Sequence, residues 1–171
     1  TDIALTKAIE QIYSYKAVHQ EAQKKYPGVF HLEFFEEKTS SDINNRSLEA
    51  VNKLLQFVQT AFVYEYDDKV WGADRAFFAE ETLYYPYADC EDRSILFSRI
   101  IRDIMGLDVV LLYYPGHLAT AVAFTQDVQG DYLVYKNRKY IVCDPTYINA
   151  PLGETMPGMN NQEAKIIVLG H

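Results

Sequence analysis

Three residues that could together perform nucleophilic catalysis stand along the chain in the order Cys90, His117 and Asp144. A cysteine thiolate attacks carbonyl carbon atoms, and a histidine takes the thiol proton and later returns it to the leaving group. A carboxylate can hold the imidazole in the tautomer that this proton transfer needs. The chain therefore contains the residue types of a thiol hydrolase or acyltransferase, and its fold must bring the three side chains together.

Cys90 heads the most regular helix that the sequence predicts. This helix runs from about residue 91 to residue 105, and Gly106 suits a left-handed C-terminal cap. Positions 90, 94, 97 and 101 share one helical face, so the thiol points with apolar side chains such as Phe97 toward a sheet. A helix N-terminus also favours a thiolate. A buried, inert cysteine is the alternative for Cys90 taken alone.

The pattern after this helix is typical of antiparallel strands, expected at 109–114, 117–125, 131–135 and 139–144. His117 opens the second of them. Alternation places Ala119, Ala121 and Ala123 on the face of His117, where small side chains would let the helix pack closely. We therefore expect the sheet to press the imidazole against Cys90.

Asp144 ends the last of these strands, immediately before Pro145. An acid at this strand end suits the group that orients the imidazole of His117. Alternation turns the neighbouring Cys143 to the opposite face, so we expect Cys143 to be core packing and a Cys90–Cys143 disulfide to be absent.

The remaining pattern indicates one α+β domain of 171 residues, with helices first and strands afterwards. A helix is predicted over about 4–25, a short strand over 29–35, a polar loop over 38–46 and a second helix over 48–62. Residues 64–89 look irregular, with Pro86 excluding a long helix. The net charge of -8 and the lack of a Lys/Arg cluster argue against nucleic-acid binding, and no apolar run is long enough for a membrane span.

The segments ADCEDRSILFSRIIRDIMGL, PGHLATAV and YIVCDPTYIN resemble the transglutaminase-like core of the papain-like thiol enzymes, over about residues 47–148. The Asp-Cys-Glu-Asp motif at 89–92 is most similar to bacterial transglutaminase-like cysteine proteinases that cleave cell-surface adhesins. The resemblance implies that an antiparallel sheet packs on the helix carrying the nucleophile. It also implies that Cys90 is the nucleophile, His117 the general base and acid, and Asp144 the orienting acid. Residues 1–45 would be a helical N-terminal extension, and the domain part of a longer protein, with a periplasmic or extracellular location favoured.

Three carboxylates, Asp89, Glu91 and Asp92, flank the thiol and should raise its pKa. They could act as helix-capping acids, or they could hold a calcium ion, which the resemblance favours. A zinc site formed by Cys90, His117 and a carboxylate is a further alternative on ligand type alone. The chemistry itself requires no cofactor.

The expected substrate is an amide bond in a protein or peptide, with water or an amine as the acceptor. The Cys90 N–H could be one oxyanion donor, with Trp71, Gln59 and the tyrosines near Tyr84 as candidates for the second. Two other classes of function stay open from the sequence. One is an inactive binding or scaffolding module on the same fold, and the other is a metal-dependent amidase.

Overall fold

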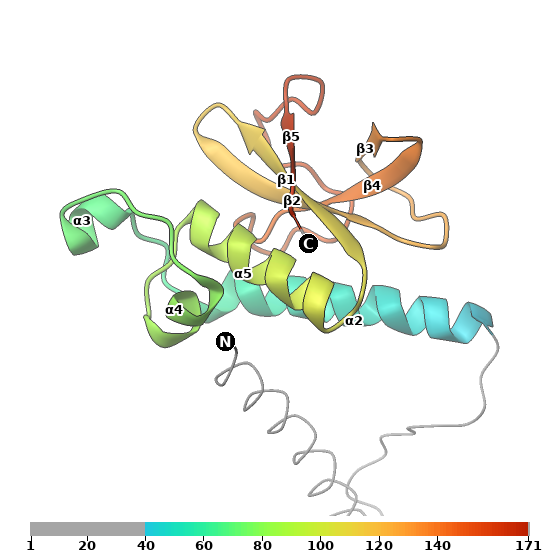
Figure 1. Cartoon of the computed structure of the whole chain (residues 1–171), viewed down its shortest axis with the longest axis horizontal. Helices are drawn as coiled ribbons and strands as arrows, with labels where there is room; N and C mark the ends of the chain where they lie inside the picture. Colours follow the sequence, from blue (N-terminus) through green and yellow to red (C-terminus); the bar gives the residue numbers. More distant parts are fainter. Residues whose placement is uncertain (1–39, 171) are drawn as a thin grey trace, which may run out of the picture. The chain divides into compact units, whose positions relative to one another are not determined.

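The computed structural model describes residues 40–170, and their helices precede an antiparallel sheet, which confirms the predicted α+β class (Figure 1). The sheet has the strand order β3-β4-β2-β1-β5. The predicted helix over 4–25 and strand over 29–35 lie outside the described residues. The helices are α2 (Ser40–Ala61), α3 (Asp67–Trp71), α4 (Ala79–Tyr84) and α5 (Cys90–Asp103), and the strands are β1 (Asp108–Tyr114), β2 (His117–Ala123), β3 (Tyr132–Tyr135), β4 (Arg138–Cys143) and β5 (Lys165–Val168).

Helix α5 begins and ends where its sequence signals predict. The Asp89 side chain caps its N-terminus, because Oδ1 accepts the N–H groups of Glu91 at 3.0 Å and Asp92 at 3.3 Å. At the other end, Gly106 has the positive φ of 65° that closes a left-handed cap, and its N–H donates to the Arg102 carbonyl. Both helix ends are therefore fixed locally, which sets the position of Cys90 as the first helical residue.

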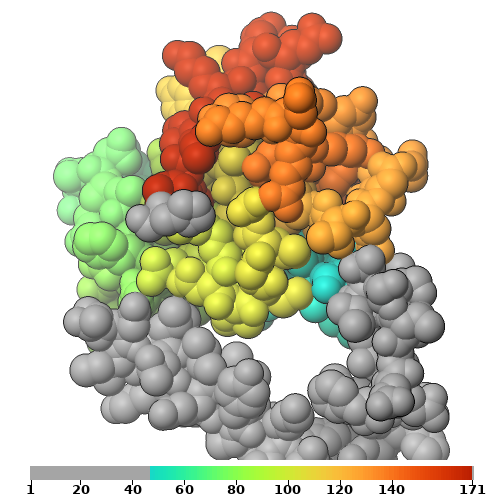
Figure 2. Space-filling view, turned by 45° about the vertical axis from the view of Figure 1, so that its right-hand side comes forward, coloured from blue at the N-terminus to red at the C-terminus, as the bar shows by residue number. Residues whose placement is uncertain are grey.

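The main core lies between the helices and one face of the sheet. In Figure 1, α5 lies directly beneath the strands and α2 runs alongside it. Figure 2 shows the green α3–α4 segment on the side of α5 away from the orange strands β3 and β4. The buried apolar residues that meet in this core come from α2, α4, α5, β1, β2 and β4: Val51, Leu55, Val58, Ala79, Leu96, Phe97, Ile101, Val109, Val122 and Cys143.

The alanine row of β2 faces the other way, so the expectation that α5 packs against these alanines is wrong. Ala119, Ala121 and Ala123 belong to a second core on the opposite face of the sheet, with Tyr140 and Val142 among their neighbours. The larger residues of β2 meet the helices instead. The small alanine side chains leave room for larger neighbours on the same face, such as Tyr140 of the adjacent strand β4, and the sequence pattern does not say which face of β2 meets the helices.

Three further differences from the sequence prediction concern helix α2, residues 64–89 and the strand after residue 164. Helix α2 already begins at Ser40 within the predicted polar loop, and no Pro or Gly interrupts residues 40–61. Residues 64–89 include the short helices α3 and α4. The edge strand β5, which pairs with β1, was not predicted. No helix among residues 40–170 has the length and apolar character needed to cross a membrane.

Candidate active site

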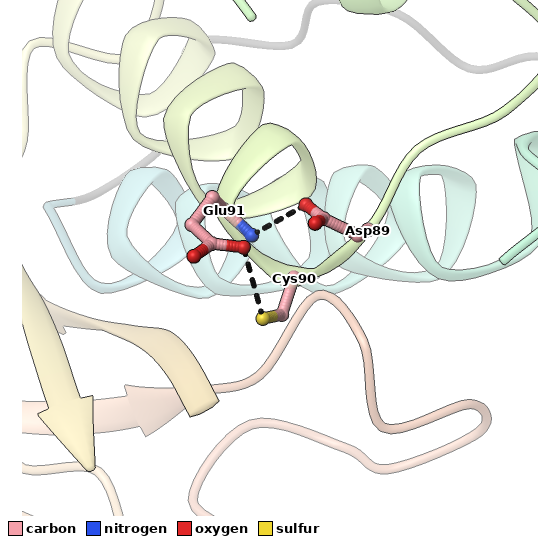
Figure 3. A group of neighbouring side chains, drawn as sticks. All are labelled: Asp89, Cys90 and Glu91. Carbon is pink, nitrogen blue, oxygen red and sulfur yellow. Dashed lines mark hydrogen bonds between the residues drawn. The ribbon is translucent and has the colours of Figure 1, made fainter. Parts of the chain in front are cut away.

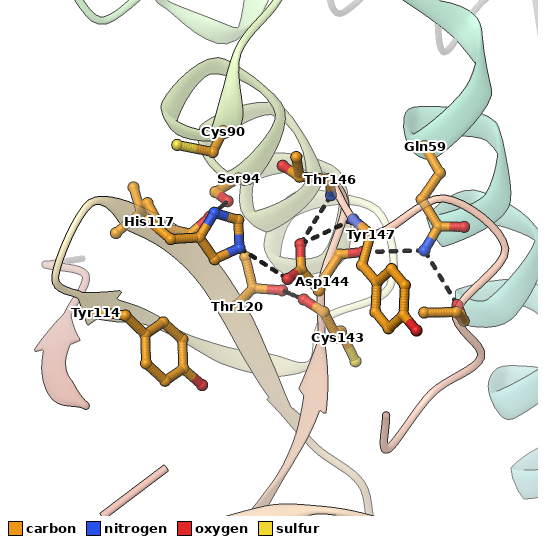
Figure 4. A network of polar contacts seen from close by, with 12 residues as sticks. Gln59, Cys90, Ser94, Tyr114, His117, Thr120, Cys143, Asp144, Thr146 and Tyr147 are labelled. Atoms are coloured by element: carbon orange, nitrogen blue, oxygen red, sulfur yellow. Dashed lines mark hydrogen bonds and ion pairs between the residues drawn. The ribbon is translucent and has the colours of Figure 1, made fainter. Parts of the chain in front are cut away.

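His117 and Asp144 form a buried hydrogen-bonded pair at the ends of neighbouring strands (Figure 4). The antiparallel register pairs Thr120 of β2 with Cys143 of β4, which brings the start of β2 beside the end of β4. His117 Nε2 lies 2.8 Å from Asp144 Oδ2, and the two residues are 7% and 2% exposed. The Thr146 and Tyr147 N–H groups donate to Asp144 Oδ1 at 2.8 and 3.2 Å. Two backbone N–H groups therefore orient the Asp144 carboxylate independently of its contact with the imidazole.

The ring of His117 is oriented on more than one side. Because Nε2 donates to the Asp144 carboxylate, Nδ1 is left as the nitrogen that can exchange a proton. Figure 4 shows this second ring nitrogen on the side of Ser94 and Cys90. The Tyr114 ring stacks on the imidazole with centroids 6.2 Å apart, and its hydroxyl donates to Asn161 Oδ1 at 2.7 Å. The imidazole thus presents one defined nitrogen toward the start of α5.

Cys90 lies at the start of α5 and packs against β1 and β2. Its side chain is 7% exposed and contacts Leu111 and Leu118, the second of which directly follows His117. The thiol donates to Glu91 Oε2 at 3.4 Å. No hydrogen bond joins Cys90 to His117 in the part of the chain that the structure describes. The fold therefore packs the thiol against Leu118, the residue that follows His117, and sulfur and imidazole are not hydrogen-bonded.

The surroundings of Cys90 disfavour a thiolate. Burial raises the pKa of the Cys90 thiol to about 12, the Leu118 backbone N–H opposes that shift, and the charges of Glu91 and Asp89 add to it. The flanking carboxylates and the burial thus outweigh the favourable position at a helix N-terminus. In this arrangement the thiol is protonated at neutral pH, and it needs the imidazole or a cation to become reactive.

Two of the three flanking acids lie together with the thiol (Figure 3). The ligand atoms of Asp89, Cys90 and Glu91 are all within 4.8 Å of one another. Burial, followed by the charge of Glu91, raises the pKa of Asp89 to about 7. Asp92 lies outside this group, because its Oδ1 accepts the Phe77 N–H at 2.8 Å. His117 is outside the group as well, so the structure gives no support to a zinc site formed by Cys90, His117 and a carboxylate.

Gln59 has a different role from the oxyanion donor considered above. Its amide nitrogen donates to the carbonyl oxygens of Asp144 at 2.9 Å and Ala150 at 3.0 Å, so both of its N–H groups are engaged. Trp71 belongs to an aromatic cluster with Phe77 and Tyr85. The Cys90 N–H remains a candidate donor, since the first N–H groups of a helix have no partner within it.

Arg93 is a buried residue of this region that we did not predict. It is 1% exposed, and its guanidinium donates to the carbonyl oxygens of Ala88, Gln59 and Phe62. Both Arg93 and Gln59 are polar residues on buried helix faces. That mismatch with the apolar pattern was the signal in the sequence that could have identified them.

Cys143 is core packing, and the two cysteines are not bonded to each other. Cys143 is 0% exposed and both thiols are free, which confirms the expected absence of a disulfide. Burial raises the pKa of the Cys143 thiol far above its ordinary value. Cys143 is therefore an internal reference for an unreactive thiol.

Comparison with known proteins found no match. The chain matches no protein-family model and no curated protein.

Proposed function

We propose that residues 40–170 form a thiol hydrolase or acyltransferase that acts on amide bonds of proteins or peptides. The observation that carries this proposal is the buried His117–Asp144 pair at 2.8 Å, whose imidazole faces the helix end where Cys90 lies. Burying a histidine beside a carboxylate costs desolvation free energy, so such a pair is weak support for stability alone. Such a pair at the ends of two strands beside a thiol is the arrangement that proton transfer to and from sulfur requires. The resemblance of residues 47–148 to transglutaminase-like enzymes points the same way.

In the proposed reaction, His117 Nδ1 takes the Cys90 proton and the thiolate attacks the amide carbonyl carbon. The Cys90 N–H donates to the oxyanion of the tetrahedral intermediate. His117 then protonates the leaving amine as the C–N bond breaks, which leaves an acyl-thioenzyme. Water gives hydrolysis and a second amine gives acyl transfer, with His117 accepting a proton from either acceptor. Asp144 stabilises the imidazolium throughout and keeps Nδ1 aimed at the sulfur.

The proposal is tested by comparing the two cysteines of the same chain. We expect iodoacetamide at pH 7 to alkylate Cys90 at least tenfold faster than Cys143, with mass mapping of the labelled peptides as the measurement. The His117→Gln variant should lose most of this difference, because the imidazole no longer takes the thiol proton. Equal reactivity in the two proteins, or faster labelling of Cys143, would remove the basis of the proposed function.

An inactive binding module is the second candidate, and one observation favours it. Burial raises the pKa of the Cys90 thiol to about 12, so the thiol is protonated and a poor nucleophile at neutral pH, as expected for a cysteine without a catalytic role. Such a module predicts labelling of Cys90 that is slow and independent of His117. The alkylation experiment therefore separates the two functions directly.

We further propose that a calcium ion binds at Asp89 and Glu91, where it would supply positive charge beside the thiol. Asp89 uses Oδ1 to cap α5 and leaves Oδ2 without a backbone donor. Burial raises the pKa of Asp89 most, and the nearby charge of Glu91 raises it further, so a cation at this position would relieve both costs. Carboxylate oxygens are the ligands that calcium prefers, and water molecules commonly complete its six to eight ligands. Asp92 is turned to Phe77 and is not part of this set.

This site predicts a distinct dependence of stability on pH. Without calcium, Asp89 has a folded-state pKa of about 7 against about 4 in the unfolded chain. Between these values the folded state holds the proton and the unfolded state does not. Asp89 therefore lowers the free energy of unfolding as pH rises from 4 to 7, by at most about 1.4 kcal/mol per pH unit.

The Asp89→Asn variant keeps a side chain that can cap α5 but does not titrate. In a calcium-free buffer, its stability relative to the unmodified chain should increase from pH 4 to pH 7, as measured by urea unfolding. Calcium should raise the melting temperature and the Cys90 labelling rate of the unmodified chain, and a chelator should lower both. Calcium should change neither in Asp89→Asn. If calcium has no effect on the unmodified chain, the acids only cap the helix.

A further inference from the structure

The last turn of α2 carries a buried amide at the centre of a polar network (Figure 4). Gln59 is 1% exposed, and its Nε2 donates to the carbonyl oxygens of Asp144 and Ala150. The first of these contacts holds the backbone of the residue whose side chain binds His117. The second holds Ala150, in the segment between β4 and β5 that follows Asp144. Gln59 therefore fixes the acid side of the site through its main chain.

The same turn of α2 is also joined to the nucleophile side. The backbone oxygen of Gln59 accepts a hydrogen bond from Arg93 Nη1 at 2.9 Å, and Phe62 accepts from Nη2 at 2.9 Å. Arg93 Nε donates to Ala88 at 3.2 Å, two residues before Cys90. One guanidinium thus connects the segment that enters α5 with the end of α2.

These contacts form a continuous bridge between two parts of the site that are far apart in the sequence. Gln59 and Asp144 are 85 residues apart, and Arg93 and Gln59 are 34 residues apart. On one side stands the start of α5 with Cys90, and on the other the loop that carries Asp144. The three hydrogen-bond acceptors of Arg93 are backbone carbonyl oxygens. Its rigid guanidinium therefore fits the positions of these three oxygens, and none of them is a carboxylate. Removal of either side chain would leave buried carbonyl groups without a partner.

We propose that Gln59 and Arg93 are positioning residues that set the separation between Cys90 and the His117–Asp144 pair. This inference rests on the proposed function of that site. Neither side chain contacts substrate in this role. Their effect on rate is geometric, because a displacement of about 1 Å at a reacting pair can cost about a hundredfold in rate.

The test compares Gln59→Met with Gln56→Met, a matched change at an exposed position of the same helix. Each protein is labelled at pH 7, as the whole chain and below its melting temperature, with two alkylating reagents: neutral iodoacetamide and anionic iodoacetate. An imidazolium beside a thiolate attracts the anionic reagent, so the ratio of the two Cys90 rates reports how close the pair is. We expect Gln59→Met to lower the Cys90 rate at least tenfold and to lower the iodoacetate-to-iodoacetamide ratio. Gln56→Met should change neither.

A purely structural role for Gln59 gives another pattern. The melting temperature then falls, Cys143 becomes labelled together with Cys90, and the ratio of the two reagents is unchanged in the folded protein. That pattern, or unchanged Cys90 rates in a folded Gln59→Met, overturns the inference. If the unmodified Cys90 shows no preference over Cys143, the proposed function fails instead.

A second variant and a second measurement cover the case in which Gln59→Met does not fold or Cys90 proves unreactive. Arg93→Lys keeps the charge but cannot span three carbonyl groups, and it should lower the same ratio. Hydrogen exchange in the unmodified chain should show slow exchange at the Thr146 and Tyr147 amides, as slow as in the core strands β1 and β2. Fast exchange at those two amides would mean that the segment around Asp144 is not held in place. That result overturns the inference without a measurement of any reaction.

Discussion

We expect Asp144→Asn to lower the rate of Cys90 alkylation at pH 7 by about 10²–10⁴-fold while the protein stays folded. The asparagine Oδ1 can still accept the Thr146 and Tyr147 N–H groups, so the amide nitrogen is turned toward His117 Nε2. Nε2 must then accept a hydrogen bond, and the ring proton moves to Nδ1. A protonated Nδ1 on a neutral imidazole cannot take the proton of Cys90.

The control for this variant is Asp127→Asn. The Asp127 side chain is 72% exposed, pairs with Lys139 and lies outside the site, so we expect no change in the Cys90 rate. Thermal unfolding of both variants shows that any loss of rate is not a loss of fold. A threefold or smaller effect of Asp144→Asn would mean that Asp144 has a structural role only, and that His117 acts without it.

Local signals were sufficient to predict the elements that carry the site. The apolar spacing of α5, the capping Asp89 and Gly106 place Cys90 at the first helical residue, as the structure shows. The four strands from β1 to β4 were predicted within two residues at each end, because alternation and turn residues are encoded over a few positions. His117 and Asp144 stand at strand ends for the same local reason.

Contacts between distant segments were beyond this kind of prediction. The alternation of β2 correctly separates two faces, but it does not say which face meets α5, and we assigned Ala119 and Ala121 to the wrong one. The strand β5 is only four residues long, and it is defined by its pairing with β1. Gln59 was considered only as an oxyanion donor and Arg93 was not predicted, because the carbonyl groups that they bind are brought to them by the tertiary fold.

Under the proposed function, the site combines a proton relay that is already in place with a thiol that is buried and protonated. The His117–Asp144 pair is held by backbone donors and by the stacked Tyr114. Cys90, in contrast, donates to Glu91 and lies among apolar side chains that raise its pKa. Under this proposal, the step that activates the thiol must change the charge around Glu91 and Cys90. This is why the calcium and alkylation experiments address the charge around sulfur, whereas Asp144→Asn addresses the relay.

The second large effect that we expect is on stability, at a close contact between two glycines. Gly153 N–H donates to the Val142 carbonyl, and the Gly153 carbonyl accepts from the Asp131 N–H, each at 2.8 Å. These bonds attach the loop after Asp144 to the sheet. A Cβ on Gly153 would lie 2.8 Å from Gly130 Cα and 2.9 Å from the Gln129 carbonyl oxygen, both of them backbone atoms. The backbones can approach this closely because neither glycine has a side chain.

We therefore expect Gly153→Ala to lower the free energy of unfolding by about 3 kcal/mol or more, measured by urea unfolding. The positive φ of 79° costs roughly 1–2 kcal/mol for an alanine, and displaced backbone hydrogen bonds add about 1 kcal/mol each. The matched control is Gly158→Ala, which has a similar φ of 89° but nothing within 4 Å of the added Cβ. It carries the conformational strain alone, so the difference between the two variants measures the contact with Gly130. If both variants lose the same stability, the loop moves freely enough to relieve the contact, and the attachment of the Asp144 loop to the sheet does not depend on it.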